Sequence, residues 1–69
     1  MKGRNQFTDD EARIIRELLQ EKVRSGNERR FRVELRAMGF YISDFARRLD
    51  GFSPADFDEF VKSGDIKIG

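Results

Sequence analysis

The sequence predicts a mainly α fold: a compact single domain of three to four helices, with a minimal two-stranded β pairing. Three observations lead to this prediction. The chain has 69 residues, which is room for one small hydrophobic core. Apolar residues recur at helical spacing in three segments that begin with capping residues. Seven phenylalanines supply aromatic bulk for a core, although 39% of the residues are charged.

The first helix is predicted over residues 8–25. Thr8 is a good N-cap residue, and Glu11 follows it three positions later, which is the capping-box pattern. Ser25 and Gly26 mark the end of the helix. Its apolar face is broad and comprises Ile14, Ile15, Leu18, Leu19 and Val23.

A second helix is predicted over residues 27–38. Asn27 is a good N-cap residue, and Gly39 suits the position just after the helix. The link between the two helices is only Gly26 and Asn27, which favours an antiparallel helical hairpin. The apolar residues of the second helix, which would then face the first, are Phe31, Leu35 and Met38.

A third helix is predicted over residues 54–63. Ser53 suits the N-cap and Pro54 the first helical position, where a missing backbone N–H costs nothing. The stretch 43–50 also begins with a serine and has helical features, so a short fourth helix there stays open.

Two short segments have the composition of extended chain. Residues 40–42 are aromatic and β-branched, and residues 66–68 alternate between apolar and charged. Because residues 66–68 need a partner strand, we expect them to pair with residues 40–42. The polar N-terminus, residues 1–6, is expected to be flexible, with the single folded domain covering 7–69.

The chain contains neither histidine nor cysteine, which removes the usual zinc ligands and the usual nucleophiles and bases at neutral pH. We therefore expect no enzyme activity, no catalytic residues and no cofactor. The acidic residues of the last segment lack the spacing of a calcium loop, so no metal site is expected either. These residues are Asp56, Asp58, Glu59 and Asp65.

No stretch of the sequence approaches the roughly 20 apolar residues of a membrane span. The N-terminal residues also lack the apolar run of a signal peptide. We expect a cytoplasmic protein that has no membrane contact and no small-molecule substrate.

Positive charge is concentrated in the middle of the chain. Residues 22–48 carry eight basic and three acidic side chains, a net charge of +5, whereas the whole chain carries +1. On a helical wheel Arg29, Arg32 and Arg36 share one face of the second helix. This pattern predicts a small DNA- or RNA-binding module, with arginines contacting phosphates. The predicted nucleic-acid-binding residues are Arg29, Arg30, Arg32, Arg36, Arg47 and Arg48.

The spacing of the middle segment also permits a helix-turn-helix arrangement. Residues 27–38 would be its first helix, and the recognition helix would begin at Ser43 and carry Arg47 and Arg48. The apolar connection and the shortness of the second helix count against it.

Two other interpretations of the same residues stay open. The arginine face is also what an ordinary solvated helix surface looks like. The broad apolar face from Ile14 to Val23 alternatively predicts a protein-protein interaction module, either a homodimer or an accessory subunit.

Overall fold

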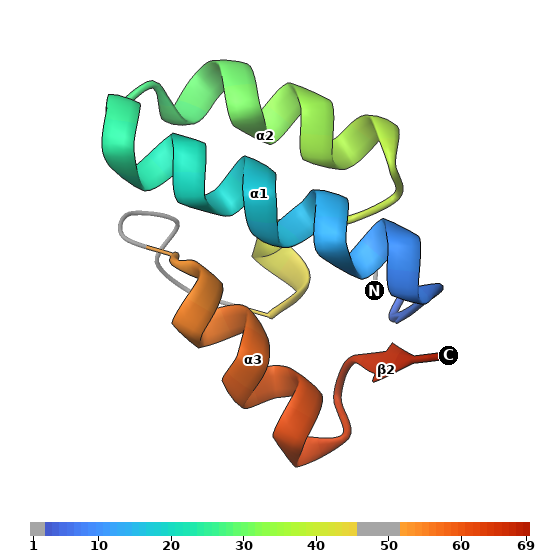
Figure 1. The fold of residues 1–69 in the computed structure, drawn as a ribbon. Coiled ribbons are helices and arrows are strands. Elements are labelled where there is room, and N and C mark those ends of the chain that lie inside the picture. Colours follow the sequence, from blue (N-terminus) through green and yellow to red (C-terminus); the bar gives the residue numbers. More distant parts are fainter. Residues whose placement is uncertain (1–2, 46–51) are drawn as a thin grey trace.

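The computed structural model describes residues 3–45 and 52–69, and in this part of the chain three helices and a short strand pair surround one core (Figure 1). The mainly α fold class predicted from the sequence is therefore confirmed. The elements in chain order are β1 (Gln6–Phe7), α1 (Asp9–Ser25), α2 (Glu28–Ala37), the 3₁₀ turn η1 (Ile42–Asp44), α3 (Pro54–Ser63) and β2 (Lys67–Ile68).

Helix α1 begins and ends where the sequence predicts. The Thr8 hydroxyl accepts a hydrogen bond from the Glu11 backbone N–H at 3.1 Å, and the Glu11 carboxylate accepts one from the Thr8 N–H at 3.0 Å. These reciprocal bonds satisfy two backbone donors that a helix start leaves unpaired. At the other end Gly26 adopts a left-handed conformation, with φ of 73°.

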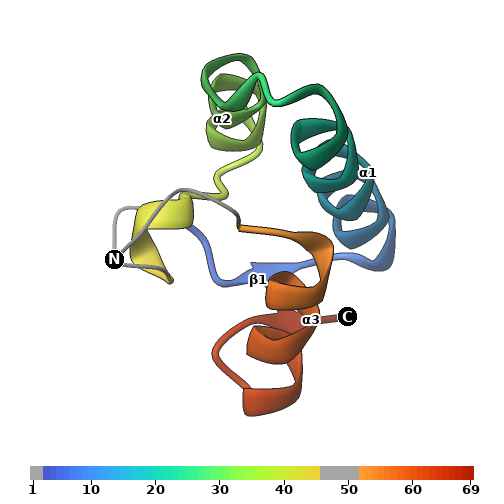
Figure 2. The same ribbon diagram turned by 90° about the vertical axis from the view of Figure 1, so that its left-hand side faces the viewer.

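Helix α2 folds back beside α1, as the predicted hairpin requires (Figures 1 and 2). The Asn27 side chain caps it by accepting a hydrogen bond from the Arg30 backbone N–H at 3.3 Å. It ends in a Schellman motif, since the N–H groups of Phe40 and Gly39 bond to the carbonyl oxygens of Leu35 and Arg36. Gly39 is left-handed there, with φ of 85°.

Helix α3 also matches its predicted range. Ser53 and Asp56 form a second capping box, and Pro54 occupies the first helical position. The helix packs against α1, where the Arg16 guanidinium group lies 2.9 Å from the Asp58 carboxylate. Helix α1 thus contacts α2 on one side and α3 on another.

The predicted pairing of residues 66–68 with 40–42 is wrong. Strand β2 instead pairs in parallel with β1, and Gln6 lies opposite Lys67. The Phe40 N–H is not available for a β-ladder, because it donates a hydrogen bond to the carbonyl oxygen of Leu35 at the end of α2. The carbonyl oxygen of Ile42 is likewise used within η1. The segment 40–42 therefore contributes buried side chains to the core and does not form a strand.

Phe40 lies at the centre of the core. Its ring centroid is 5.5 to 6.1 Å from those of four other phenylalanines, which come from β1, the end of η1, the chain before α3, and α3 itself. Aromatic pairs at this spacing are favourable beyond the area they bury. The four partners are Phe7, Phe45, Phe52 and Phe57.

The N-terminal segment lies against the rest of the domain from Gly3 onwards. The Gly3 N–H donates to the Asp44 carboxylate at 2.9 Å, and the Arg4 N–H donates to the Gly39 carbonyl at 2.7 Å. The Arg4 guanidinium group binds both carboxylate oxygens of Glu11, at 2.8 and 3.0 Å. These bonds bring the start of the chain to the ends of α2 and η1. The predicted boundary between a flexible 1–6 and a folded 7–69 stays a prediction.

Candidate nucleic-acid interface

Helix α2 lies at the edge of the molecule. Only two of its side chains, Phe31 and Leu35, are buried, and both belong to its inner side. Figure 2 shows the helix almost end-on, with α1 beside it and none of the labelled helices or strands over its outer side. Among the described residues, no helix or strand therefore covers the outer side of α2.

Four of the arginines predicted to bind nucleic acid lie on α2. Arg29 and Arg36 are exposed, and Arg32 is half-buried on the same face. Arg30 is exposed on a different flank, with its guanidinium carbon 5.3 Å from the centre of the Phe31 ring. The guanidinium carbon of Arg36 lies 5.4 Å from the centre of the Tyr41 ring. The structure thus brings three of these side chains together on one face.

The basic residues of α1 and α2 differ in their ion pairing. Those of α1 each lie within 4.0 Å of a carboxylate: Arg13 of Asp10, Arg16 of Asp58, Lys22 of Glu28, and Arg24 of Glu21. None of the four arginines of α2 forms an ion pair with a carboxylate in the described part of the chain. No carboxylate of residues 3–45 or 52–69 therefore pairs with the arginines of α2.

The two glutamates of α2 do not neutralise this face. Glu28 lies one turn before Arg32, but its carboxylate lies 3.9 Å from the Lys22 ammonium group and forms no ion pair with a described arginine. Glu34 follows Arg29 by five positions, which places it about 140° around the helix. The surface bounded by Arg29, Arg32 and Arg36 consequently carries three positive charges and no carboxylate.

Arg32 holds a hydrogen-bond donor that the domain does not use. Its Nε atom is buried and has no acceptor among the described residues. A buried donor without a partner is costly, and rotation of the side chain toward a bound anion would relieve that cost.

Lys22 is one of the eight basic residues in the +5 charge of residues 22–48, but it does not lie on the surface. The residue is 2% exposed. Its ammonium group donates a hydrogen bond of 2.9 Å to the carbonyl oxygen of Phe52. A signal was present in the sequence, because Lys22 follows Ile15 by seven positions and Leu18 by four, which places it on the apolar face.

Two of the predicted arginines, Arg47 and Arg48, lie outside the described residues. The helix-turn-helix interpretation depends on them and on a recognition helix that begins at Ser43. The structure has the 3₁₀ turn η1 at Ser43 instead of the start of an α-helix. Within residues 3–45 and 52–69 the second helix of that motif is therefore not present.

The apolar face on which a protein-interaction module would depend is mostly core. Ile15 and Leu19 are fully buried, while Ile14 and Val23 are 41% and 55% exposed. The two exposed residues are nine positions apart, which places them on opposite sides of α1. Each is therefore a single exposed apolar side chain, and the two do not form one apolar patch.

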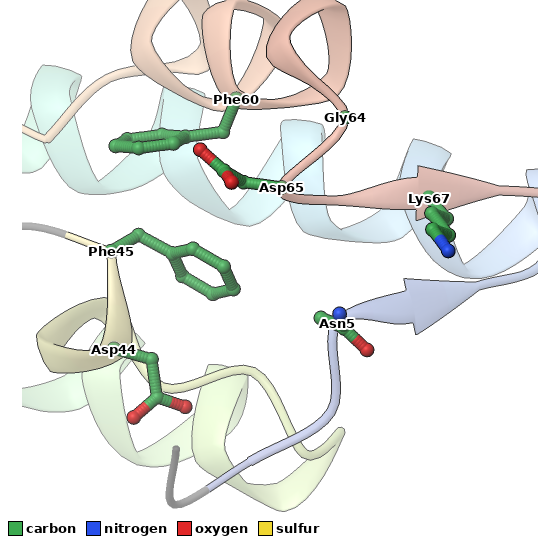
Figure 3. Close-up of a pocket in the computed structure, with 7 residues that line it drawn as sticks. All are labelled: Asn5, Asp44, Phe45, Phe60, Gly64, Asp65 and Lys67. Atoms are coloured by element: carbon green, nitrogen blue, oxygen red, sulfur yellow. The ribbon is translucent and has the colours of Figure 1, made fainter.

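A surface pocket of about 530 Å³ lies where the N-terminal segment, η1 and the α3–β2 connection meet (Figure 3). The Phe45 and Phe60 rings form its apolar wall, 5.6 Å apart between centroids. The carboxylates at its border already accept hydrogen bonds, Asp44 from the Gly3 N–H and Asp65 from the Ser63 hydroxyl. The remaining lining residues are Asn5, Gly64 and Lys67.

Among the described residues no group of three or more acidic side chains lies close enough to hold a metal ion. The same residues include no helix that is both long and apolar enough to cross a membrane. Comparison with models of protein families, with curated proteins and with solved structures found no match to this chain. The function therefore has to be argued from the surface of the domain itself.

Proposed function

We propose that this protein is a small nucleic-acid-binding module that contacts phosphates through the outer face of α2. Arg29, Arg32 and Arg36 are the principal contacts. Arg30, together with Arg47 and Arg48 from the adjoining segment, adds to them. The proposal includes a cytoplasmic location, where nucleic acid is accessible.

The observation that supports this proposal most is the difference in ion pairing between the two helices. The α1 cations are paired with carboxylates, whereas the α2 arginines have no such pair within the part of the chain that the structure describes. Arginine presents a planar set of donors that matches phosphate oxygens, and its charge is permanent. Among the described residues, these arginines therefore need not break an ion pair with a carboxylate before they bind a phosphate backbone.

Binding of this kind has a characteristic dependence on salt. Each phosphate that a side chain neutralises releases condensed counterions, so the logarithm of affinity falls linearly with the logarithm of salt concentration. Three arginine–phosphate contacts on duplex DNA give a slope of about −2.7, or about a 40-fold loss of affinity between 50 and 200 mM salt. Such contacts position the nucleic acid but convey little sequence information.

The experiment is fluorescence anisotropy with labelled duplex DNA, single-stranded DNA and RNA at these two salt concentrations. Binding that weakens with salt as calculated would support the proposal. Absence of binding to all three probes at 50 mM salt would contradict it, and the α2 arginines would then be an ordinary solvated surface.

A further inference from the structure

One exposed apolar residue borders the arginine face of α2. Val33 is 62% exposed, which is more than either of the exposed apolar residues of α1. It follows Arg29 by four positions and precedes Arg36 by three, so the three side chains form one ridge along α2. Contact with phosphates gives the isopropyl group of Val33, which lies beside these arginines, no role in binding.

From this ridge we infer that α2 enters the major groove of duplex DNA, with Val33 packed on the C5-methyl groups of thymine. This inference rests on the proposed function and specifies its ligand. The thymine methyl is the apolar feature that the major groove displays, and small apolar side chains contact it. Arg29 and Arg36, on either side of Val33 along the helix, then reach the phosphates that border the groove.

The dimensions of α2 agree with this placement. Its ten residues make a helix about 15 Å long, and a helix with its side chains is about 10–12 Å across. The major groove of B-DNA is about 12 Å wide and admits an α-helix. Because α2 is packed against the domain only through its inner side, it can enter the groove without a rearrangement of the core (Figure 2).

Duplex RNA is the wrong ligand for the same surface. The major groove of an A-form helix is deep and narrow and is closed to side chains, and RNA carries uracil, which lacks the methyl group. We therefore expect the α2 surface to bind duplex DNA more tightly than duplex RNA. The difference arises from the shape of the major groove and from the methyl group that each thymine carries and uracil lacks.

The test compares two duplexes of about 20 base pairs, two helical turns, that differ only in this methyl group. One is an alternating adenine–thymine duplex, in which every base pair carries the methyl, and the other has uracil in place of thymine. We expect about fourfold tighter binding of the thymine duplex, the contribution of one buried methyl-sized group. Val33→Ala should abolish the difference, and Val23→Ala, at an exposed valine of α1, should preserve it.

The remaining outcomes separate this inference from the proposed function. Equal affinity of the unaltered protein for the thymine and uracil duplexes would overturn groove insertion while nucleic-acid binding stands. Equal or tighter binding of a duplex RNA would also overturn it. Absence of binding to every nucleic acid would overturn the proposed function itself, and this inference with it. Circular dichroism of Val33→Ala should show unchanged helix content, since alanine favours helix at this exposed position.

Discussion

The Lys22 ammonium group donates a hydrogen bond to the carbonyl oxygen of Phe52, thirty residues further along the chain. The side chain of Lys22 is 1% exposed, and the Glu28 carboxylate lies 3.9 Å from its ammonium group. This contact joins three parts of the domain: the last turns of α1, the start of α2 and the chain that enters α3. The hydrogen bond and the nearby carboxylate both offset the cost of burying this ammonium group.

Replacement of this lysine should therefore cost stability. Lys22→Met keeps most of the side-chain volume but leaves the Phe52 carbonyl oxygen without its donor. We expect the free energy of unfolding to fall by about 1–3 kcal/mol, measured by urea denaturation. Lys62→Met, at an exposed lysine of α3, is the matched control and should change stability by less than about 0.5 kcal/mol. Equal effects of the two variants would mean that Lys22 is not compensated in the way described.

The ion pair of Arg4 and Glu11 should make stability depend on acid pH. Hydrogen bonds from the Arg4 guanidinium group and from the Thr8 backbone N–H lower the pKa of Glu11 from 4.5 to about 2. Because the folded state holds this proton less tightly than the unfolded state, the stabilisation is complete above pH 4.5. It is lost as the pH falls toward 2.

Urea denaturation at several pH values between 5 and 2 measures this effect. The free energy of unfolding of Glu11→Gln should fall less steeply over this range than that of the unaltered protein. Glu17→Gln, at an exposed glutamate of the same helix, should retain the steeper dependence. If Glu11→Gln and the unaltered protein show the same dependence, the Arg4–Glu11 pair is not formed in solution.

Gly3 tests how firmly the N-terminal segment is packed. A Cβ atom at this position would overlap the Gly39 carbonyl oxygen and lie 2.5 Å from the Tyr41 ring. Gly3→Ala should therefore displace the segment and lower the free energy of unfolding by about 1–3 kcal/mol, in line with other overpacked sites. Unchanged stability would instead agree with the sequence-based prediction that residues 1–6 are flexible.

The helices could be predicted because their signals are local. The capping boxes at Thr8 and Ser53 each depend on a partner three residues away, and the glycines after the helices each adopt the left-handed conformation that few other residues accept. The Arg29, Arg32 and Arg36 face followed from helical periodicity within one element. Those features needed no knowledge of the rest of the chain.

The strand pair could not be predicted in the same way. Each strand is only two residues long, and Gln6 lies in a polar segment with no alternation to mark it as extended. Its pairing with Lys67 joins the two ends of the chain, which no local pattern encodes. The aromatic segment 40–42 offered the stronger β composition, but burial beside the other phenylalanines determines its conformation.

The comparison that tests nucleic-acid binding by α2 most directly uses two double variants of equal charge. Arg29→Ala with Arg32→Ala removes two unpaired arginines of α2, and Arg13→Ala with Arg24→Ala removes two exposed, ion-paired arginines of α1. Anisotropy against duplex DNA over a range of salt concentrations should give a salt slope that is shallower by about 2 for the α2 variant, with weaker binding. The α1 variant should retain a slope close to that of the unaltered protein. Equal slopes for the two variants would show that net charge, and not the α2 face, governs binding.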